Sequence, residues 1–164
     1  MSVFILILAL LWLPDATTGP AQNTWQKYEG AWFEIRYPPG FRVRPSQSST
    51  SASGYDSAFF VASDGTVEFY VFAPQWNGTA RDIELDPATE TLVSQNVVQS
   101  GSKRIRRVTI KAQDGSYQRS YEDTEDAATN TRKIFGIKYA NADAYNRYRQ
   151  AYLTFKASLV QFAD

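Results

Sequence analysis

Apolar and polar residues alternate along most of the chain, and this period of two predicts half-buried β-strands. The clearest example is the sequence AWFEIRY at 31–37, in which Phe33, Ile35 and Tyr37 share one side. Further strands are expected where similar alternation is bounded by turn residues such as Pro-Pro-Gly, Asp-Gly or Ser-Gly. These strands are expected at 41–44, 55–62, 66–73, 89–99, 103–112, 116–123 and 131–140.

Three segments between these strands read as loops. The run of small polar residues at 46–53 contains no large apolar side chain, so we expect a mobile loop that tolerates deletion. The connection at 74–87 is long and irregular, and it carries Trp76. The segment 122–129 is rich in Asp and Glu and is expected to form an acidic loop.

The period changes near the C-terminus, where large apolar residues follow one another at intervals of three and four. They are Tyr145, Tyr148, Tyr152, Phe155, Leu159 and Phe162. This spacing predicts one helix at about 142–161, with Asn141 as its N-cap and Asp143 in its first turn. The basic residues expected to face away from the apolar stripe are Arg147, Arg149 and Lys156. Because one apolar stripe needs a surface to cover, we predict an α+β fold in which the helix packs on an antiparallel sheet.

The first residues read as an export signal. The apolar run VFILILALLWL at 3–13 is too short to span a bilayer and is typical of a signal-peptide core. Small residues then favour cleavage after Ala21, although no basic residue precedes Lys27, and a buried N-terminal strand or helix is the alternative. We therefore expect a signal peptide at 1–21, a single α+β domain at 22–164, and a periplasmic or secreted protein.

Composition narrows the function. The 164 residues include no His and no Cys, which excludes His- or Cys-dependent catalysis, the usual zinc ligands and disulfides from this chain alone. The 17 basic and 17 acidic residues balance, which argues against a dedicated nucleic-acid binder. We expect no enzyme activity, no cofactor and no metal.

Sequence features at both ends are similar to the PsbP/Mog1-like superfamily. They are the W-x-x-Y pattern at 25–28, the strand and turn WFEIRYPPGF at 32–41, and the closing FKASL at 155–159. The resemblance implies an α/β/α sandwich with a second, shorter helix, for which 84–94 is the candidate, although β-branched residues at 89–98 argue against a long one. It also implies binding rather than catalysis, since PsbP-type members are extracytoplasmic accessory subunits of photosystem II and Mog1-type members bind a small GTPase.

A cluster of basic residues is one candidate contact surface. The basic run comprises Lys103, Arg104, Arg106 and Arg107. It could bind a phosphate, an anionic lipid headgroup or an acidic protein. Successive residues of a strand point to opposite faces, so the run cannot form one basic face without a bulge. The alternative is cross-strand pairing with Glu122, Asp123 or nearby acids.

Trp76 is the best single contact candidate, because an aromatic residue in the loop sequence PQWNG has little packing reason to be there.

The acidic residues Glu122, Asp123, Glu125 and Asp126 could hold a hard cation, but no EF-hand pattern supports this and a solvated turn is favoured. A ligand groove beside Tyr145, Tyr148 and Tyr152 is an alternative to their burial in the core.

These observations predict an exported, non-enzymatic binding or accessory protein of the PsbP/Mog1-like type. Its partner would be a protein or an anionic component of the cell envelope. The alternative is a small-ligand-binding or carboxylate-dependent hydrolytic module of the envelope.

Overall fold

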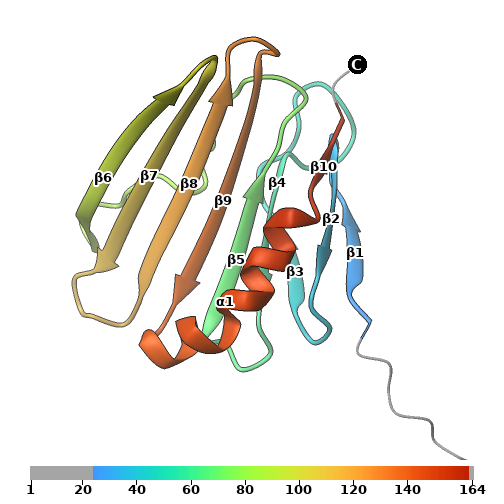
Figure 1. The fold of residues 1–164 in the computed structure, drawn as a ribbon. Coiled ribbons are helices and arrows are strands. Elements are labelled where there is room, and N and C mark those ends of the chain that lie inside the picture. Colours follow the sequence, from blue (N-terminus) through green and yellow to red (C-terminus); the bar gives the residue numbers. More distant parts are fainter. Residues whose placement is uncertain (1–23, 163–164) are drawn as a thin grey trace, which may run out of the picture.

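The computed structural model describes residues 24–162, which form ten β-strands and one α-helix (Figure 1). The elements are β1 (Gln26–Glu29), β2 (Phe33–Tyr37), β3 (Arg42–Pro45), β4 (Ser57–Val61), β5 (Val67–Phe72), β6 (Glu90–Ser100), β7 (Lys103–Ala112), β8 (Gln118–Asp126), β9 (Thr131–Tyr139), α1 (Ala142–Ala157) and β10 (Val160–Gln161). Each strand predicted from alternation is present, and the expected α+β class is confirmed.

The strands form two antiparallel sheets rather than one. The larger sheet has seven strands in the order β3-β4-β5-β9-β8-β7-β6, and the smaller has three in the order β1-β2-β10. Strands β4 and β5 form a hairpin, and Gly65 in its turn has φ +69°, a conformation that glycine adopts without steric cost. The middle of the larger sheet therefore combines strands that are neighbours in sequence with β9, which arrives from near the C-terminus.

Helix α1 packs against β9, β5 and β2, so it bridges the two sheets (Figure 1). Its Phe155 is fully buried, and its ring lies 5.0 Å from the ring of Phe60, 5.3 Å from Phe69 and 6.3 Å from Phe135. Tyr152 lies 5.3 Å from Phe69. The 3-4 spacing of aromatic residues is thus the packing stripe that the sequence predicts.

The predicted start of α1 is confirmed, because the Asn141 side chain accepts a hydrogen bond from the Ala144 amide. Its predicted end is wrong, since the helix stops at Ala157 rather than near position 161. Ser158 Oγ donates to the Phe155 carbonyl and accepts from the Arg36 amide. This contact with β2 allows the following residues to pair with β2 as strand β10 instead of continuing the helix.

One basic residue of α1 does not face away from the sheet as expected. Lys156 Nζ lies 2.8 Å from Glu122 Oε1 on β8, and it also lies over the rings of Phe135 and Tyr152. The long aliphatic stem of lysine permits this, because it can cover apolar surface while its ammonium reaches a carboxylate. Arg147 behaves as expected, with an exposed side chain 3.3 Å from Asp64.

Two other expectations about local structure are wrong. The second helix expected at 84–94 is not formed, and turns at 82–83 and 87–89 lead directly into β6. The acidic loop expected at 122–129 is mostly strand, because β8 continues to Asp126 and its carboxylates pair with basic residues of β7. The turn between β8 and β9 occupies 127–130 instead.

The expected signal peptide at 1–21 lies outside the described residues. Within 24–162, no helix has the length and apolar character needed to cross a membrane.

Removal of the aromatic side chains with which α1 packs on the sheet, the buried Phe155 and the partly buried Tyr152, should destabilise the protein strongly. We expect Phe155→Ala and Tyr152→Ala each to lower the free energy of unfolding by about 3–5 kcal/mol, because truncation loses transfer energy and leaves a cavity. Leu153→Ala is the matched control, since Leu153 is 42% exposed on the same helix and should change stability by less than about 1 kcal/mol. Urea denaturation measures all three, and equal small shifts would contradict the packing described.

Candidate functional site

In the described part of the chain, the face of the larger sheet opposite α1 is not covered by a helix. This face, called here the open face, carries Tyr70, Tyr121 and Asp123, whose side chains alternate with those that contact α1. The loop at 73–89 crosses the open face, because it links β5 to the edge strand β6, and β9, β8 and β7 lie between these two strands (Figure 1). The open face is therefore where loop residues and strand residues can form a site.

Arg119 on β8 fastens the second half of this loop. Its guanidinium donates to the carbonyl oxygens of Ile83 and Glu84, at 3.1 and 3.0 Å, and to the carboxylate of Glu90 at 2.5–2.6 Å. Tyr117 donates a further hydrogen bond of 2.7 Å to Glu90. The Arg119 guanidinium, the Glu90 carboxylate, the Tyr117 hydroxyl and the two loop carbonyl groups are paired with one another, so this cluster positions the loop.

A second polar cluster fastens the middle of the loop. Asp82 accepts hydrogen bonds from Ser57 Oγ at 2.5 Å and from the Tyr70 hydroxyl at 2.7 Å. Burial and the neighbouring Asp82 raise the pKa of Tyr70, which keeps its hydroxyl protonated as the donor. The Tyr121 ring packs beside Tyr70 and over Gly136, where an added Cβ would clash with the ring.

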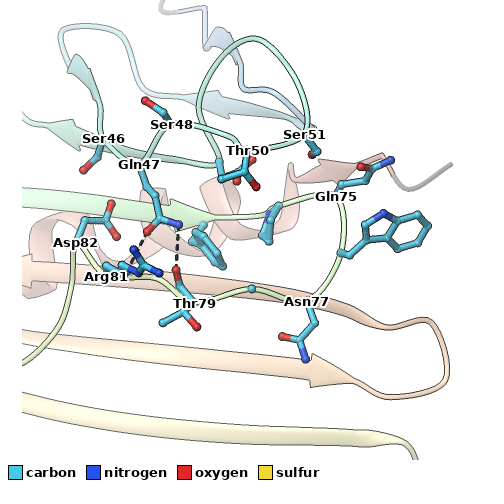
Figure 2. A pocket seen from close by; sticks show the side chains of 15 residues that line it. Ser46, Gln47, Ser48, Thr50, Ser51, Gln75, Asn77, Thr79, Arg81 and Asp82 are labelled. Carbon is cyan, nitrogen blue, oxygen red and sulfur yellow. Dashed lines mark hydrogen bonds between the residues drawn. The ribbon is translucent and has the colours of Figure 1, made fainter.

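The main cleft of the described residues lies where this loop meets the segment 46–53. It has a volume of about 600 Å³ and is lined by hydroxyl, amide, carboxyl and aromatic groups (Figure 2). One side is formed by Gln47, Ser48, Thr50 and Ser51, and the other by Gln75, Trp76, Asn77, Thr79 and Arg81. We call it the Trp76 cleft. Trp76 is 40% exposed there, as expected for a residue without a packing role.

The two sides of the cleft are joined by Gln47. Figure 2 shows its side-chain amide between Arg81 and Thr79: Nε2 donates to the Thr79 carbonyl and Oε1 accepts from the Arg81 amide, both at 2.9 Å. Trp32 Nε1 donates to Ser51 Oγ, also at 2.9 Å. The sequence shows no anchor for the segment 46–53, but the structure supplies several from distant parts of the chain.

Asp56 is the least expected lining residue. It is only 7% exposed, and its Oδ1 is buried without a hydrogen-bond partner among the described residues. Burial raises the pKa of Asp56, although a hydrogen bond with Ser49 opposes this. Burial therefore makes the charged form of this lining carboxyl less favourable than that of an exposed aspartate.

The basic run has the alternative arrangement considered for it. Each member pairs with an acidic residue of β8 directly across the ladder. The pairs are Lys103–Asp126 at 4.0 Å, Arg104–Glu125 at 3.6 Å, Arg106–Asp123 at 3.0 Å and Arg107–Glu122 at 2.9 Å. The side chains still have exposed fractions of 37–57%, so a contact with a partner stays a prediction. Such a contact would involve both faces of the β7–β8 pair, on which the basic and acidic charges nearly cancel.

The acidic residues of β8 do not gather around a cation site. Asp123 is held by Arg132, whose Nη2 lies 2.7 Å from its Oδ2, as well as by Arg106. Across residues 24–162, no group of three acidic side chains is arranged to hold a metal ion. Tyr145, Tyr148 and Tyr152 pack against the main core. Tyr145 also lines a smaller groove of about 280 Å³, where the start of α1 meets the larger sheet.

Comparisons with known structures show the fold. No protein-family model and no curated protein sequence matches this chain. The solution structure of cyanobacterial PsbP (CyanoP) from Synechocystis sp. PCC 6803 aligns over 91% of this chain and 99% of its own, with a TM-score of 0.51 and 12% identity. The PsbP/Mog1-like fold expected from the sequence is thereby confirmed.

Two further structures align more weakly. The Ran-binding protein Mog1p from Saccharomyces cerevisiae covers 87% of this chain and 97% of its own, with a TM-score of 0.43 and 11% identity. A mutant form of the protein Mog1 covers 85% and 97%, with a TM-score of 0.42 and 12% identity. At such identities the likeness describes the path of the chain and transfers no site residue.

The Arg119–Glu90 cluster should make stability sensitive to acid. Burial would raise the pKa of Glu90, but hydrogen bonds from Arg119, the Asp86 amide and Tyr117 lower it from 4.5 to about 2. Because the folded pKa is below the unfolded one, this group stabilises the fold fully above pH 4.5. We expect about 3 kcal/mol of that contribution to be lost as the pH falls from about 4.5 to 2.

Denaturation of wild type and Glu90→Gln at several pH values between about 7 and 2 tests this. The variant should be less stable at neutral pH and should lack the Glu90 part of the acid-induced loss. Glu29→Gln, at a side chain that is 64% exposed, should retain the wild-type profile. Parallel pH profiles for wild type and Glu90→Gln would show that Glu90 is not the acid-sensitive group.

Proposed function

We propose that this chain is an extracytoplasmic, non-enzymatic binding or accessory protein that holds a protein partner at the Trp76 cleft. The observation that carries the proposal is the cleft itself. It combines an exposed indole with hydroxyl and amide groups, a composition that suits recognition of a polypeptide segment through one aromatic anchor and several hydrogen bonds. The CyanoP-like fold supports this role by analogy alone.

The arrangement of polar groups favours binding over chemistry. Asp82 already accepts two short hydrogen bonds, and Ser57, which donates one of them, is fully buried. Neither residue is therefore available as a base or a nucleophile at the surface of the cleft. Arg81, whose backbone amide is fixed by Gln47, contributes a cationic side chain to the same lining.

A small polar ligand is the second candidate, because a volume of about 600 Å³ lies within the range of small-molecule sites. In this reading Trp76 would stack on the ligand while the side chains of 46–51 supply hydrogen bonds. The two candidates would shield different surfaces from solvent. A protein partner would cover the exposed loop surface around Trp76, and a small ligand would only fill the cleft.

The basic run is a secondary contact in this proposal. Since each of its members is balanced by a carboxylate of β8, it would add little long-range attraction. The partner's main recognition element is expected at Trp76, with any contribution from Lys103, Arg104, Arg106 or Arg107 limited to the rate of association.

Substitution of Trp76 should weaken partner binding without weakening the fold. We expect Trp76→Ala to accelerate dissociation of a complex captured from the host's cell envelope by about 10- to 30-fold, because a desolvated aromatic anchor acts mainly on the off-rate. Leu153→Ala is the control, since Leu153 is 42% exposed but lies on α1 outside the cleft. Equal dissociation from both variants, or a large loss of melting temperature in Trp76→Ala, would remove Trp76 from the contact surface.

Export is the second part of the proposal. The apolar run at 3–13 and the small residues before Gln22 motivate it. We expect the intact mass of protein recovered from outside the cytoplasm to correspond to a chain that begins near Gln22. A mature species that retains 3–13 would contradict export by this route.

A further inference from the structure

The Trp76 cleft has a buried carboxyl group in its wall that is only partly paired. Asp56 lines the cleft although it is only 7% exposed. Ser49 forms a hydrogen bond with this carboxyl group, and Oδ1 is the atom that has no partner among residues 24–162. A buried acceptor without a donor is unfavourable, because it has lost its hydrogen bonds with water and has gained none in exchange. A ligand that brings a donor to Oδ1 would remove this cost.

Carboxyl groups outnumber cations in the lining of the cleft. The charged residues there are Asp56, Asp82 and Arg81. Asp82 already accepts hydrogen bonds from two hydroxyl groups. The pKa of Asp56 is shifted by burial and by Ser49, with no effect of Arg81. A positively charged donor therefore suits this cleft best, because it both completes the hydrogen bonding of Asp56 and favours its charged form.

The apolar part of the lining suits a long aliphatic stem. Phe72, Pro74 and the exposed Trp76 line the same cleft. Lysine combines a four-carbon stem with a compact ammonium group, so it can lie along apolar surface while its charge reaches a carboxyl group. An ammonium group also gains from contact with an indole ring. Arginine fits less well, since its planar guanidinium pairs best with both oxygens of a carboxylate, and only Oδ1 of Asp56 is unpaired.

We propose that the Trp76 cleft binds a lysine side chain of the protein partner, whose ammonium group donates a hydrogen bond to Asp56 Oδ1. This inference rests on the function proposed above, because it names the group that the partner inserts into the same cleft. The unpaired carboxyl oxygen is unfavourable in the free protein, and the bound lysine offsets that cost in the complex.

Two matched peptides test the need for the charge on the unaltered full chain. Acetyl-Gly-Gly-Lys-Gly-Gly-amide carries the ammonium group, and the same peptide with ε-N-acetyl-lysine keeps the stem but lacks the charge. NMR titration measures both at the backbone amides of 46–56 and 74–82 and at the Trp76 indole, at up to about 10 mM peptide, since one side chain gives weak binding. We expect the lysine peptide to bind more tightly by about tenfold or more, because hydrogen bonds to charged groups are the stronger ones.

Substitution of Asp56 tests the role of the carboxyl group. Asp56→Asn keeps the size of the side chain and removes its charge, so the preference for the lysine peptide should fall to about twofold or less. Glu29→Gln is the matched control, since the Glu29 side chain is 64% exposed and lies outside the cleft, and it should keep the wild-type preference. A cooperative thermal transition shows that each variant is folded. The comparison of peptides on wild type needs no substitution, so it decides even where Asp56→Asn does not fold.

Three results would overturn the inference. Equal binding of both peptides at the cleft would exclude the ammonium group as the recognised feature, while the cleft would stay a binding site. A lysine preference that persists in Asp56→Asn would place the ammonium group away from Asp56. Failure of both peptides to change any signal of the cleft would refute lysine recognition there, and dissociation of the partner from Trp76→Ala would then decide the proposed function separately.

Discussion

Burial of Phe155 of α1 against the larger sheet is the interaction on which the rest of the structure depends. Its ring contacts Phe60 and Phe69 of the larger sheet, while α1 as a whole also packs on β2 of the smaller one. Because α1 packs on both sheets, Ser158 at its end reaches the backbone of Arg36 on β2, and the chain continues as β10 of the smaller sheet. The helix thus closes one face of the larger sheet, and the opposite face is covered by the loop between β5 and β6, whose Ala80 and Ile83 pack on a second, smaller apolar cluster.

Polar contacts hold this loop in place on the opposite face, in addition to the apolar cluster beneath it. Arg119 and Glu90 form a buried ion pair that also satisfies two loop carbonyl groups, and Asp82 is held by Ser57 and Tyr70. Well-packed apolar residues of the same volume are often as stabilising as such a network, but removal of one partner from the network is costly, so the network requires a particular arrangement of the loop. The Trp76 cleft has its shape because the loop between β5 and β6 is fixed in this way.

The sequence indicated Trp76 as a contact candidate, because an aromatic residue in a loop between proline and glycine has no evident packing partner. It did not indicate Gln47, Asp56 or Arg81 as lining residues of the cleft. Polar residues of these types are common in loops, and nothing in the spacing connects 47 with 79 and 81. The basic run is a different case, because the contact surface predicted there stays a prediction. Its four cationic residues within 103–107 suggest a surface, but pairing of β7 with β8 places a carboxylate opposite each of them.

The sequence by itself determined the strands and the start and apolar stripe of α1, because these follow from periodicity and capping within short segments. The PsbP/Mog1-like fold class was indicated by the resemblance of the motifs at 25–28, 32–41 and 155–159. Only the tertiary structure decided that β8 extends through the acidic residues, that α1 ends at Ala157, and that Lys156 turns inward to Glu122. Each of these depends on a partner far away in the sequence. From the sequence alone, the carboxylates at 122–126 are typical of a solvated loop. They are recognised as part of a strand only when β7, which carries their counter-charges, lies beside them.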